Sequence, residues 1–528
     1  MCFYRRKTVE LKKKSIRMCR LKKKTMSQIT MDDDFIVPDV KPDIEKIVID
    51  DGEVEIEEVK RLPEKVQLRG KLSYRLLYYP AEGGRLESMA GSIPFDEYVN
   101  VPELDSRDYL QTGAEIEDLT IELIHSRKIN VKAIITFRLT VEGLEEQNAV
   151  VDIEDAGPAE MLMRAVRAAQ AAVCQKDTYR VKEEIEIGSS QPDIEELLWG
   201  QCRLRNVQTR PLDGSLSIQG VLDVFCVYRG PEAHIPPQWV EKEIPFAGSL
   251  EFPDVTEDMY PEITVHMGHC QMEEQPDFDG ENRSIALDAV LELDIRLYEE
   301  ENIQVVSDVY SPAAKLEPEY VPAEVEEILV RNSSRTRVNG KVRSSTGDNV
   351  LQVCHVDGSI KLDDVEIVED GLLIEGALCL KILYMTDSDS SPLQSMREVM
   401  PFQYKADARG IDPDCVYQLN TGLEQLGAIM LGGGEMEIKG VVLFDLLVRK
   451  RTKEQMITGV SEGPVDLEEV EKLPGIVVYV VQPDDTLWKI AKKFHAAVES
   501  LRSMNHLGEN GPVPGDRLLI VKQVERVL

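Results

Sequence analysis

The feature that most constrains this chain is a ten-residue segment that occurs three times, at residues 70–79, 220–229 and 376–385. Each copy begins with glycine and continues with an apolar residue at every second position, ending on a tyrosine. Because successive side chains of a strand point to opposite faces, this period predicts a β-strand with one apolar face. That face is formed by Leu72, Tyr74, Leu76 and Tyr78, by Leu222, Val224, Cys226 and Tyr228, and by Leu378, Leu380, Ile382 and Tyr384. The opposite face is mixed, which fits either a wetter surface or one that is covered by a second sheet.

The surroundings of this segment repeat in the same register. A Pro-Phe step follows each copy at positions 94–95, 245–246 and 401–402, and a tyrosine follows at 109, 260 and 417. A second alternating segment closes each copy, near residues 133–141, 289–297 and 440–448. Upstream, Pro42-Asp43-Ile44-Glu45 returns at residues 192–195, but not in the third copy. The repeats therefore predict three units that share one β-rich fold.

Length and pattern together suggest a division of the 528 residues into tandem domains, at about 150 residues per domain. The expected segments are a tail at 1–29, β-units at 30–145, 178–302 and 332–452, linkers at 146–177, 303–331 and 453–475, and a terminal module at 476–523. We expect sandwich-like β-units, so the fold class is mainly β with a small α+β module at the end.

The first two linkers have helical character. Leu162, Ala165, Val166, Ala169 and Val173 recur at helical spacing, and a shorter run covers residues 323–330 after a Pro-rich joint. The third linker is acidic. We therefore expect helical connections between the β-units and a spacer before the terminal module.

Charge is unevenly distributed along the chain. Residues 1–25 contain eleven Lys or Arg and one acid, a local balance of +10 that leaves about −45 on the rest. An acidic body repels nucleic acid and anionic lipid, so only the tail would offer peripheral membrane contact. We expect the tail to be disordered and dispensable for folding, either as a polybasic arm or as a segment preceding a true start at Met26.

The sequence lacks the usual signatures of export, of a membrane span and of catalysis. Nine cysteines form no CxxC pair, no apolar segment follows the basic start, and no apolar run approaches the roughly 18 residues of a membrane span. The sequence thus predicts a reducing, cytoplasmic location. His266, His269 and Cys270 have metal-like spacing but lack a fourth ligand, and no nucleophile, phosphate-loop or dinucleotide signature occurs. We expect no metal, no cofactor and no enzymatic activity.

The terminal module is predicted to have a strand, two helices and a closing strand, with a core formed mainly by Val478, Val480, Leu487, Ile490, Ala491 and Phe494. Its sequence from Tyr479 to Ala491, with Asn505-His506-Leu507 and residues 514–518, closely resembles a LysM module. In that family two loops line a groove for N-acetylglucosamine chains, which implies Asp485, Thr486, Leu487, Asn505 and Leu507 here. Asp484 stands where the family usually has glycine, and its charge favours a protein ligand. We add Asp484, His506 and Trp488 to the expected site; Trp488 fits either the core or an interface anchor.

The three repeated units resemble SPOCS domains of endospore-forming Firmicutes. SPOCS units followed by one C-terminal LysM module resemble the SipL-like spore morphogenesis family, whose members act in the mother cell. The resemblance implies a spore coat scaffold at the forespore surface, with the LysM module bound to the stage IV sporulation ATPase and the SPOCS units recruiting coat proteins. The alternative is a cell-wall protein that binds peptidoglycan glycans through LysM, which would need export.

Overall fold

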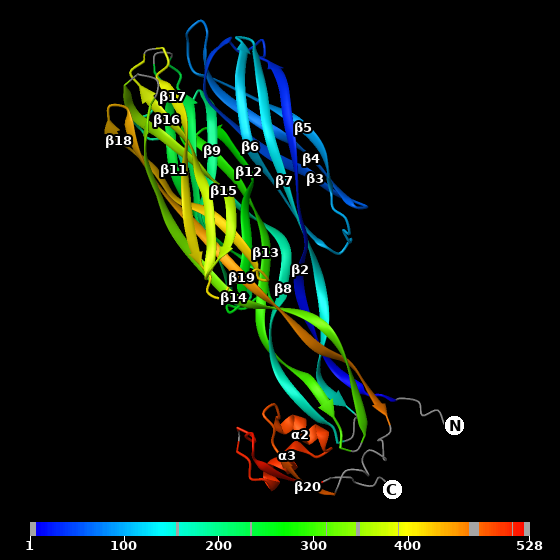
Figure 1. Ribbon diagram of the computed structural model, residues 1–528. Helices are drawn as coiled ribbons and strands as arrows, with labels where there is room; N and C mark the ends of the chain where they lie inside the picture. Colours follow the sequence, from blue (N-terminus) through cyan, green and yellow to red (C-terminus); the bar gives the residue numbers. More distant parts are fainter. Residues whose placement is uncertain are drawn as a thin grey trace.

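The structure, a computed structural model, describes residues 7–154, 158–232, 235–312, 314–344, 349–388, 390–463, 475–508 and 510–521. The molecule is elongated (Figure 1). Three β-units form a head at one end, their longest strands continue together as a stalk, and a small α+β domain lies beside the far end of the stalk.

Each unit is built from six consecutive strands. The first contains β2 (Glu10–Ile36), β3 (Ile44–Leu62), β4 (Lys65–Pro80), β5 (Glu87–Asn100), β6 (Tyr109–His125) and β7 (Lys128–Glu154). The second contains β8 (Glu160–Glu186), β9 (Glu196–Leu212), β10 (Ser215–Arg229), β11 (Gln238–Glu251), β12 (Tyr260–Gln275) and β13 (Ser284–Tyr310). The third contains β14 (Lys315–Arg343), β15 (Val350–Val368), β16 (Gly371–Thr386), β17 (Leu393–Asp407), β18 (Val416–Gly432) and β19 (Glu435–Gly463).

The strands of each unit form two antiparallel sheets over a common hydrophobic core. One sheet has the order β3-β4-β5, repeated as β9-β10-β11 and β15-β16-β17. The other pairs the last strand with the first and fifth strands of its unit: β2-β7-β6, β8-β13-β12 and β14-β19-β18. The glycine-led segment is the middle strand of the first sheet in all three units, so the prediction of repeated β-units is confirmed.

The leading glycine of each repeat is explained by close packing. Gly70 is paired with Phe95, and a Cβ atom at Gly70 would lie 2.7 Å from the Phe95 ring and 2.0 Å from the carbonyl oxygen of Glu55. The pairs at 220–246 and 376–402 repeat this arrangement. A glycine beneath a cross-strand aromatic ring thus fixes the register of the two strands.

The tyrosine at the end of each repeat is buried in all three units. The Tyr78 hydroxyl donates to the Pro42 carbonyl, and Tyr228 donates to the Pro192 carbonyl, both at 3.2 Å. In the third unit, which lacks the Pro-Asp-Ile-Glu motif, Tyr384 lies 3.2 Å from the Ser344 hydroxyl instead. The motif therefore supplies a carbonyl acceptor for a buried phenol.

The opposite, mixed face of the repeated strand is covered by the other two units. Its apolar residues form one cluster with residues from all three units: Val48, Ile49, Leu77, Tyr79, Leu86, Leu198, Trp199, Phe225, Val227, Cys354, Leu383 and Leu393. Beside it, Asp51 accepts hydrogen bonds from Lys381 at 2.7 Å and Arg75 at 3.1 Å, and Arg203 pairs with Asp357 at 3.0 Å. The polar residues on this face therefore join the units.

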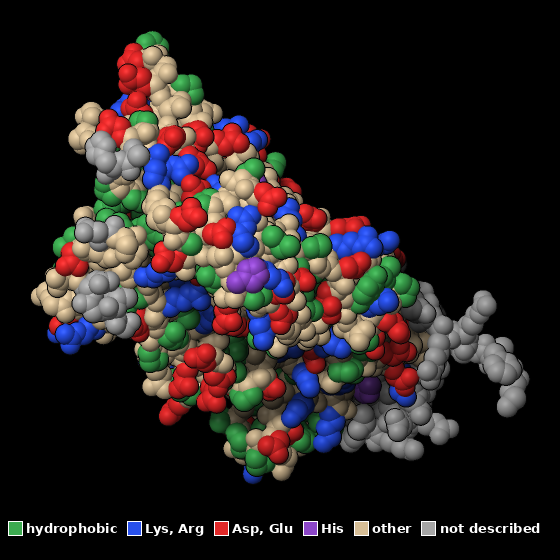
Figure 2. All heavy atoms as spheres, turned by 90° about the horizontal axis from the view of Figure 1, so that it is seen from above, with side chains coloured by type: hydrophobic (Ala, Val, Ile, Leu, Met, Phe, Trp, Pro, Cys, Tyr) green, Lys and Arg blue, Asp and Glu red, His purple; other side chains and the backbone are tan. Residues whose placement is uncertain are grey.

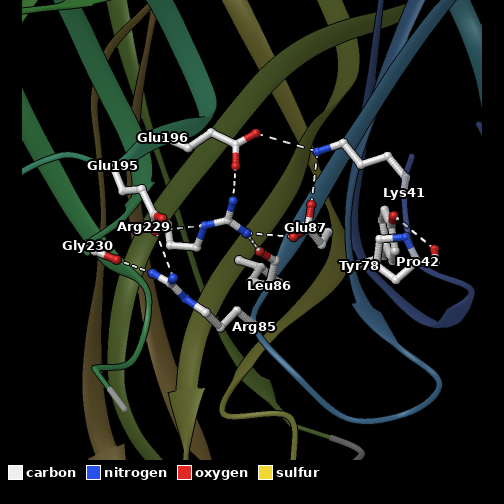
Figure 3. A network of polar contacts seen from close by, with 10 residues as sticks. All are labelled: Lys41, Pro42, Tyr78, Arg85, Leu86, Glu87, Glu195, Glu196, Arg229 and Gly230. Atoms are coloured by element: carbon white, nitrogen blue, oxygen red, sulfur yellow. Dashed lines mark hydrogen bonds and ion pairs between the residues drawn. The ribbon is translucent and has the colours of Figure 1, made fainter. Parts of the chain in front are cut away.

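A second polar network joins the first two units, as Figure 3 shows. Arg229 of β10 donates to Glu87 of β5 at 2.6 Å and also pairs with Glu196. Lys41 donates to Glu87 at 2.9 Å and lies 3.5 Å from Glu196. Arg85 extends the network by pairing with Glu195 at 2.7 Å. The units are thus associated through charged contacts as well as a shared apolar cluster.

The stalk consists of three two-stranded ribbons, the continuations of β2–β7, β8–β13 and β14–β19 (Figure 1). The strand β1 (Lys7–Thr8) pairs with β19 and so links the first ribbon to the third. Apolar side chains from all three ribbons fill the interior: Ile16, Met18, Ala149, Val166, Ala168, Ile303, Val305, Ala323, Val325 and Met456, then Val9, Val150, Ile153, Val306, Val309, Leu316, Ile457 and Val460 nearer the tip.

The two predicted helical linkers are wrong. Residues 160–177 lie in β8 and residues 323–330 lie in β14. In β8 a register shift between Val173 and Ala171 changes which residues face inward, and the adjacent residues Ala168 and Ala169 are both buried. The bulge and this local departure from strict alternation therefore produce apolar spacing that imitates a helix.

The predicted disordered tail at 1–29 is also corrected, for the residues that the structure describes. β2 begins at Glu10, and Ile16, Met18 and Cys19 are buried. Several of its cations are partnered: Arg20 pairs with Glu145 of the same ribbon and, at 2.7 Å, with Glu324 of the third. Lys14, Arg17 and Lys22 form further ion pairs. This segment is a stalk strand rather than a free polybasic arm.

The remaining linker predictions change in the same way. The span 303–331 contains the last residues of β13 and the first part of β14. The acidic linker predicted at 453–475 begins inside β19, and its residues 464–474 lie outside the described residues. The predicted unit limits at 145, 302 and 452 fall within β7, β13 and β19. Each long strand therefore belongs to the head at one end and to the stalk at the other.

The surface reflects the composition of the chain. Seen from above the head, acidic and basic side chains are interspersed with apolar ones (Figure 2). No helix within the described ranges has the length and apolar character to span a membrane.

Candidate partner-binding site

The terminal domain contains β20 (Ile476–Val480), α2 (Leu487–Lys493), α3 (Val498–Met504) and β21 (Arg517–Val521). The two strands pair antiparallel, and the domain's core contains Val481, Leu487, Ile490, Ala491, Phe494, Ala496, Leu501, Leu518 and Ile520. The predicted order of strand, two helices and strand is therefore correct. The helical residues expected in the core, from Leu487 to Phe494, are buried.

The inward face of β20 differs from the expected one. The prediction that Val478 and Val480 lie in the core is wrong: they are 63% and 46% exposed, whereas Val477 and Tyr479 pack against the core. In a strand where almost every residue is apolar, alternation does not reveal the inward face, and a one-residue change of phase inverts the assignment.

The loop before α2 is held by its own side chains. The Thr486 hydroxyl accepts a hydrogen bond from the Lys489 amide at 3.2 Å and caps the helix. The Asp485 carboxylate accepts from the Gln482 amide at 2.8 Å and from the Tyr479 hydroxyl at 2.7 Å, and these bonds lower the pKa of Asp485. Asp484 is exposed. The loop is thus ordered while one carboxylate faces solvent.

The second predicted loop, at 505–507, is anchored to β21. The Asn505 side chain donates to the Leu519 carbonyl at 2.8 Å and accepts from the Leu519 amide at 2.6 Å. It also donates to the Leu501 carbonyl at 2.9 Å. His506 is exposed, and Leu507 packs against the core that contains Leu487. The amide of Asn505 therefore secures the fold.

Trp488 joins the terminal domain to the stalk. Its indole nitrogen donates to Asp308 at 2.8 Å, and its ring meets Tyr310 edge-on with centroids 4.9 Å apart. Lys492 donates to the same Asp308 carboxylate at 2.6 Å, and the buried Tyr310 hydroxyl donates to the Ala496 carbonyl at 2.7 Å. Burial raises the pKa of Asp308, but the bonds from Lys492 and Trp488 outweigh it and leave the pKa below its ordinary value.

The eight residues expected at the site therefore have different environments. Asp484, Thr486 and His506 are exposed, Asp485, Trp488, Asn505 and Leu507 are half-buried, and Leu487 is buried. The exposed residues remain the candidates for contact with a partner. Trp488 is explained by the contact with the stalk.

Sequence reasoning missed Asp308 and Tyr310, which complete the docking surface of the terminal domain. They lie at the tip of β13, where the Pro-rich segment was expected to be a linker. Nothing in the local pattern distinguishes them, because their partners lie about 180 residues further along the chain.

Comparison with known protein families gives matches to two family models. One, described as "SipL, SPOCS domain", matches residues 43–124, 193–273 and 349–431. The other, described as the LysM domain, matches residues 479–521. No curated protein and no solved structure matches the chain significantly. The SPOCS matches cover the second to fifth strands of each unit, so most of each long stalk strand lies outside them.

Proposed function

We propose that this chain, a SipL-like protein with three SPOCS domains and a C-terminal LysM domain, is a non-enzymatic adaptor in spore coat morphogenesis. In this proposal the LysM domain binds the stage IV sporulation ATPase on the forespore surface, in the mother-cell cytoplasm, and the SPOCS head recruits coat proteins. The identity of these partners comes from the family. SPOCS and LysM are non-catalytic domain families, which is consistent with a binding function.

The main support for the proposal is the attachment of the LysM domain to the stalk. Asp308 and Tyr310 hold Trp488 and Lys492 against the stalk, while Asp484 and the neighbouring loop remain exposed. A small recognition domain fixed to a long stalk presents its loop in a defined direction. Such preorganisation reduces the entropy lost when a partner binds.

The geometry of the loop favours a protein ligand over a neutral glycan. The polar groups of Asp485 and Asn505 are occupied within the domain, which leaves fewer hydrogen-bonding groups for sugar hydroxyls. The exposed Asp484 carboxylate would complement a basic group on a protein. Binding of N-acetylglucosamine chains remains the second candidate, because the LysM family match itself favours it.

The test uses the full chain and the purified ATPase. Asp484→Lys should weaken binding by about tenfold or more if the loop contributes at the level of an interface hot spot. Glu499→Lys, the same charge change on an exposed residue of α3, should leave affinity nearly unchanged and serves as the matched control. Chitin oligosaccharides are titrated in parallel. Tight oligosaccharide binding without any affinity for the ATPase would replace this proposal by the wall-binding alternative.

A further inference from the structure

A cavity of about 690 Å³ lies between the first and second units and is lined by several sulfur-containing side chains. Among its lining residues are Cys202, Cys270, Met89, Met267 and Met272. The proposed function leaves this cavity unused. Cys202 and Cys270 face each other, and the residues at the corresponding positions of the first and third units show what normally occupies this place.

In the first and third units this position holds a glycine facing a leucine. A Cβ atom on Gly52 would lie 2.7 Å from a methyl group of Leu119, and one on Gly358 would lie 2.7 Å from a methyl group of Leu426. In both units the leucine thus fills the space that the glycine leaves open across the two sheets. Packing of a large residue against a small one is ordinary core complementarity.

In the middle unit both members of this pair are cysteine. Cys202 pairs with Val224 in β10 and Cys270 pairs with Ala289 in β13, the register positions that correspond to the glycine and the leucine of the sister units. Cys202 is buried, Cys270 is half-buried, and both residues line the same cavity. Two thiols therefore meet across the sheets where the sister units have simple packing.

The environment assigns different roles to the two thiols. The neighbouring Cys202 thiol, together with nearby Arg75, lowers the pKa of Cys270, whereas the Cys270 thiol and burial raise the pKa of Cys202. Cys270 is thus the better source of thiolate, and thiolate is the form that attacks disulfides. Cys226 lies 3.6 Å from the sulfur of Met272, and burial raises the pKa of Cys226 to about 12, so it is a poor competitor.

We propose that Cys202 and Cys270 form a reversible disulfide when the protein meets a low-molecular-weight disulfide, which reaches the pair through this cavity. Cys270 attacks as thiolate; one sulfur–sulfur bond of the reagent breaks, one small thiolate leaves, and Cys270 carries a mixed disulfide. Cys202 then loses its proton and attacks the Cys270 sulfur, displacing the second small thiolate. The protein gives up two electrons and two protons, and the reagent is reduced to two thiols.

The bond would tie β9 to β12 and so join the two sheets of the middle unit. Strand β9 also carries Trp199, in the apolar cluster shared by all three units, and Arg203, which pairs with Asp357 of the third unit. A cross-link between distant strands stabilises mainly by restricting the unfolded chain. Oxidation would therefore strengthen the centre of the head without new contacts on its surface.

The pair can be tested on the full-length, fully reduced protein. After incubation with oxidised glutathione, peptide mapping without reductant should find Cys202 linked to Cys270, and the melting temperature should rise by several degrees and return with dithiothreitol. Cys202→Ser should instead retain one glutathione on Cys270, with no rise in melting temperature. Cys226→Ser should respond as the unaltered protein does.

The sister units supply a matched control. The double variant Cys202→Gly, Cys270→Leu restores their packing and should fold with no response to oxidised glutathione. A second pair of neighbouring thiols, Cys19 and Cys174, packs in another apolar cluster, is not among the residues that line the cavity, and provides an internal comparison.

Three results would overturn the proposal. The first is a Cys270 that stays as alkylatable after glutathione treatment as before, and the second is a cross-link confined to Cys19 and Cys174. The third is protection of Cys202 and Cys270 by copper(I) without any disulfide, which would make the pair a soft-metal site. Within the described residues no group of three or more His, Cys, Asp or Glu is arranged for a metal.

Discussion

The indole nitrogen of Trp488 donates a 2.8 Å hydrogen bond to the carboxylate of Asp308, a residue that lies 180 positions earlier in the chain. Lys492 donates to the same carboxylate, and Tyr310 packs against the indole ring. One acidic residue at the tip of β13 therefore connects the LysM domain to the stalk.

Replacing Asp308 by alanine should release the LysM domain without unfolding it. The change removes the carboxylate that accepts hydrogen bonds from both Trp488 and Lys492. Hydrogen bonds to charged groups contribute about 1.5–3 kcal/mol each to stability. We expect faster hydrogen exchange in α2 and around Ala496, while the head strands stay protected. Asp484→Ala removes an exposed carboxylate from the same domain and is the control. Unchanged exchange in Asp308→Ala would show that the contact is not needed for docking.

The same contact should depend on pH. Because the pKa of Asp308 in the folded protein lies below its ordinary value, its contribution is fully present above the ordinary pKa of about 3.9 and is lost as the pH falls through the lower, folded-state value. Small-angle scattering across this range should show the LysM domain leaving the stalk in acid. In Asp308→Asn, which cannot ionise, this part of the pH dependence should be absent. An identical acid transition in both proteins would assign it to other carboxylates.

Gly70→Ala should strongly destabilise the first unit. The added carbon would lie 2.0 Å from the Glu55 carbonyl oxygen, a backbone atom that cannot rotate away. We therefore expect the free energy of unfolding to fall by about 3 kcal/mol, the upper end of the range for overpacking. Gly113→Ala in β6 is the matched control, since nothing lies within 4 Å of its added carbon. Chemical denaturation measures both. Equal losses would mean that strand propensity, not the close approach, decides the effect.

The first 25 residues should be needed for full stability. Ile16 is completely buried between the ribbons, so Ile16→Ala should lower the free energy of unfolding by about 2–5 kcal/mol. Met26→Ala, on the same strand but 70% exposed, should have almost no effect. A chain starting at Met26 should melt several degrees lower than the full chain. Equal melting temperatures would restore the interpretation of this segment as a dispensable tail.

The sequence predicts the head well because there each sheet has one face in its own unit's core. Leu72, Tyr74, Leu76 and Tyr78 alternate with residues of another kind, and this period identifies both the strand and its buried face. Repetition then extends the assignment to three units. The mixed opposite face fits a wetter surface or one covered by a second sheet, but its pattern does not predict a junction of three units.

The stalk could not be predicted from the sequence, because its residues do not alternate regularly between a buried and an exposed face. In β8 the adjacent residues Ala168 and Ala169 are both buried, and a bulge beside Ala171 shifts the period. In the LysM domain, the Thr486 cap and the buried helical residues follow from local rules. The role of Trp488 does not, because its partners come from β13 and only folding brings them together.

The arrangement of the three ribbons has a mechanical consequence. Their ends lie together at the stalk tip, where Glu10 pairs with Glu154, Glu160 with Tyr310, and Lys315 with Gly463. Ladder hydrogen bonds run perpendicular to the strands. A pull applied at the tip along the stalk axis, away from the head, therefore loads many of these bonds in shear at once, instead of opening them one after another. The stalk therefore resists tension applied between its tip and the head.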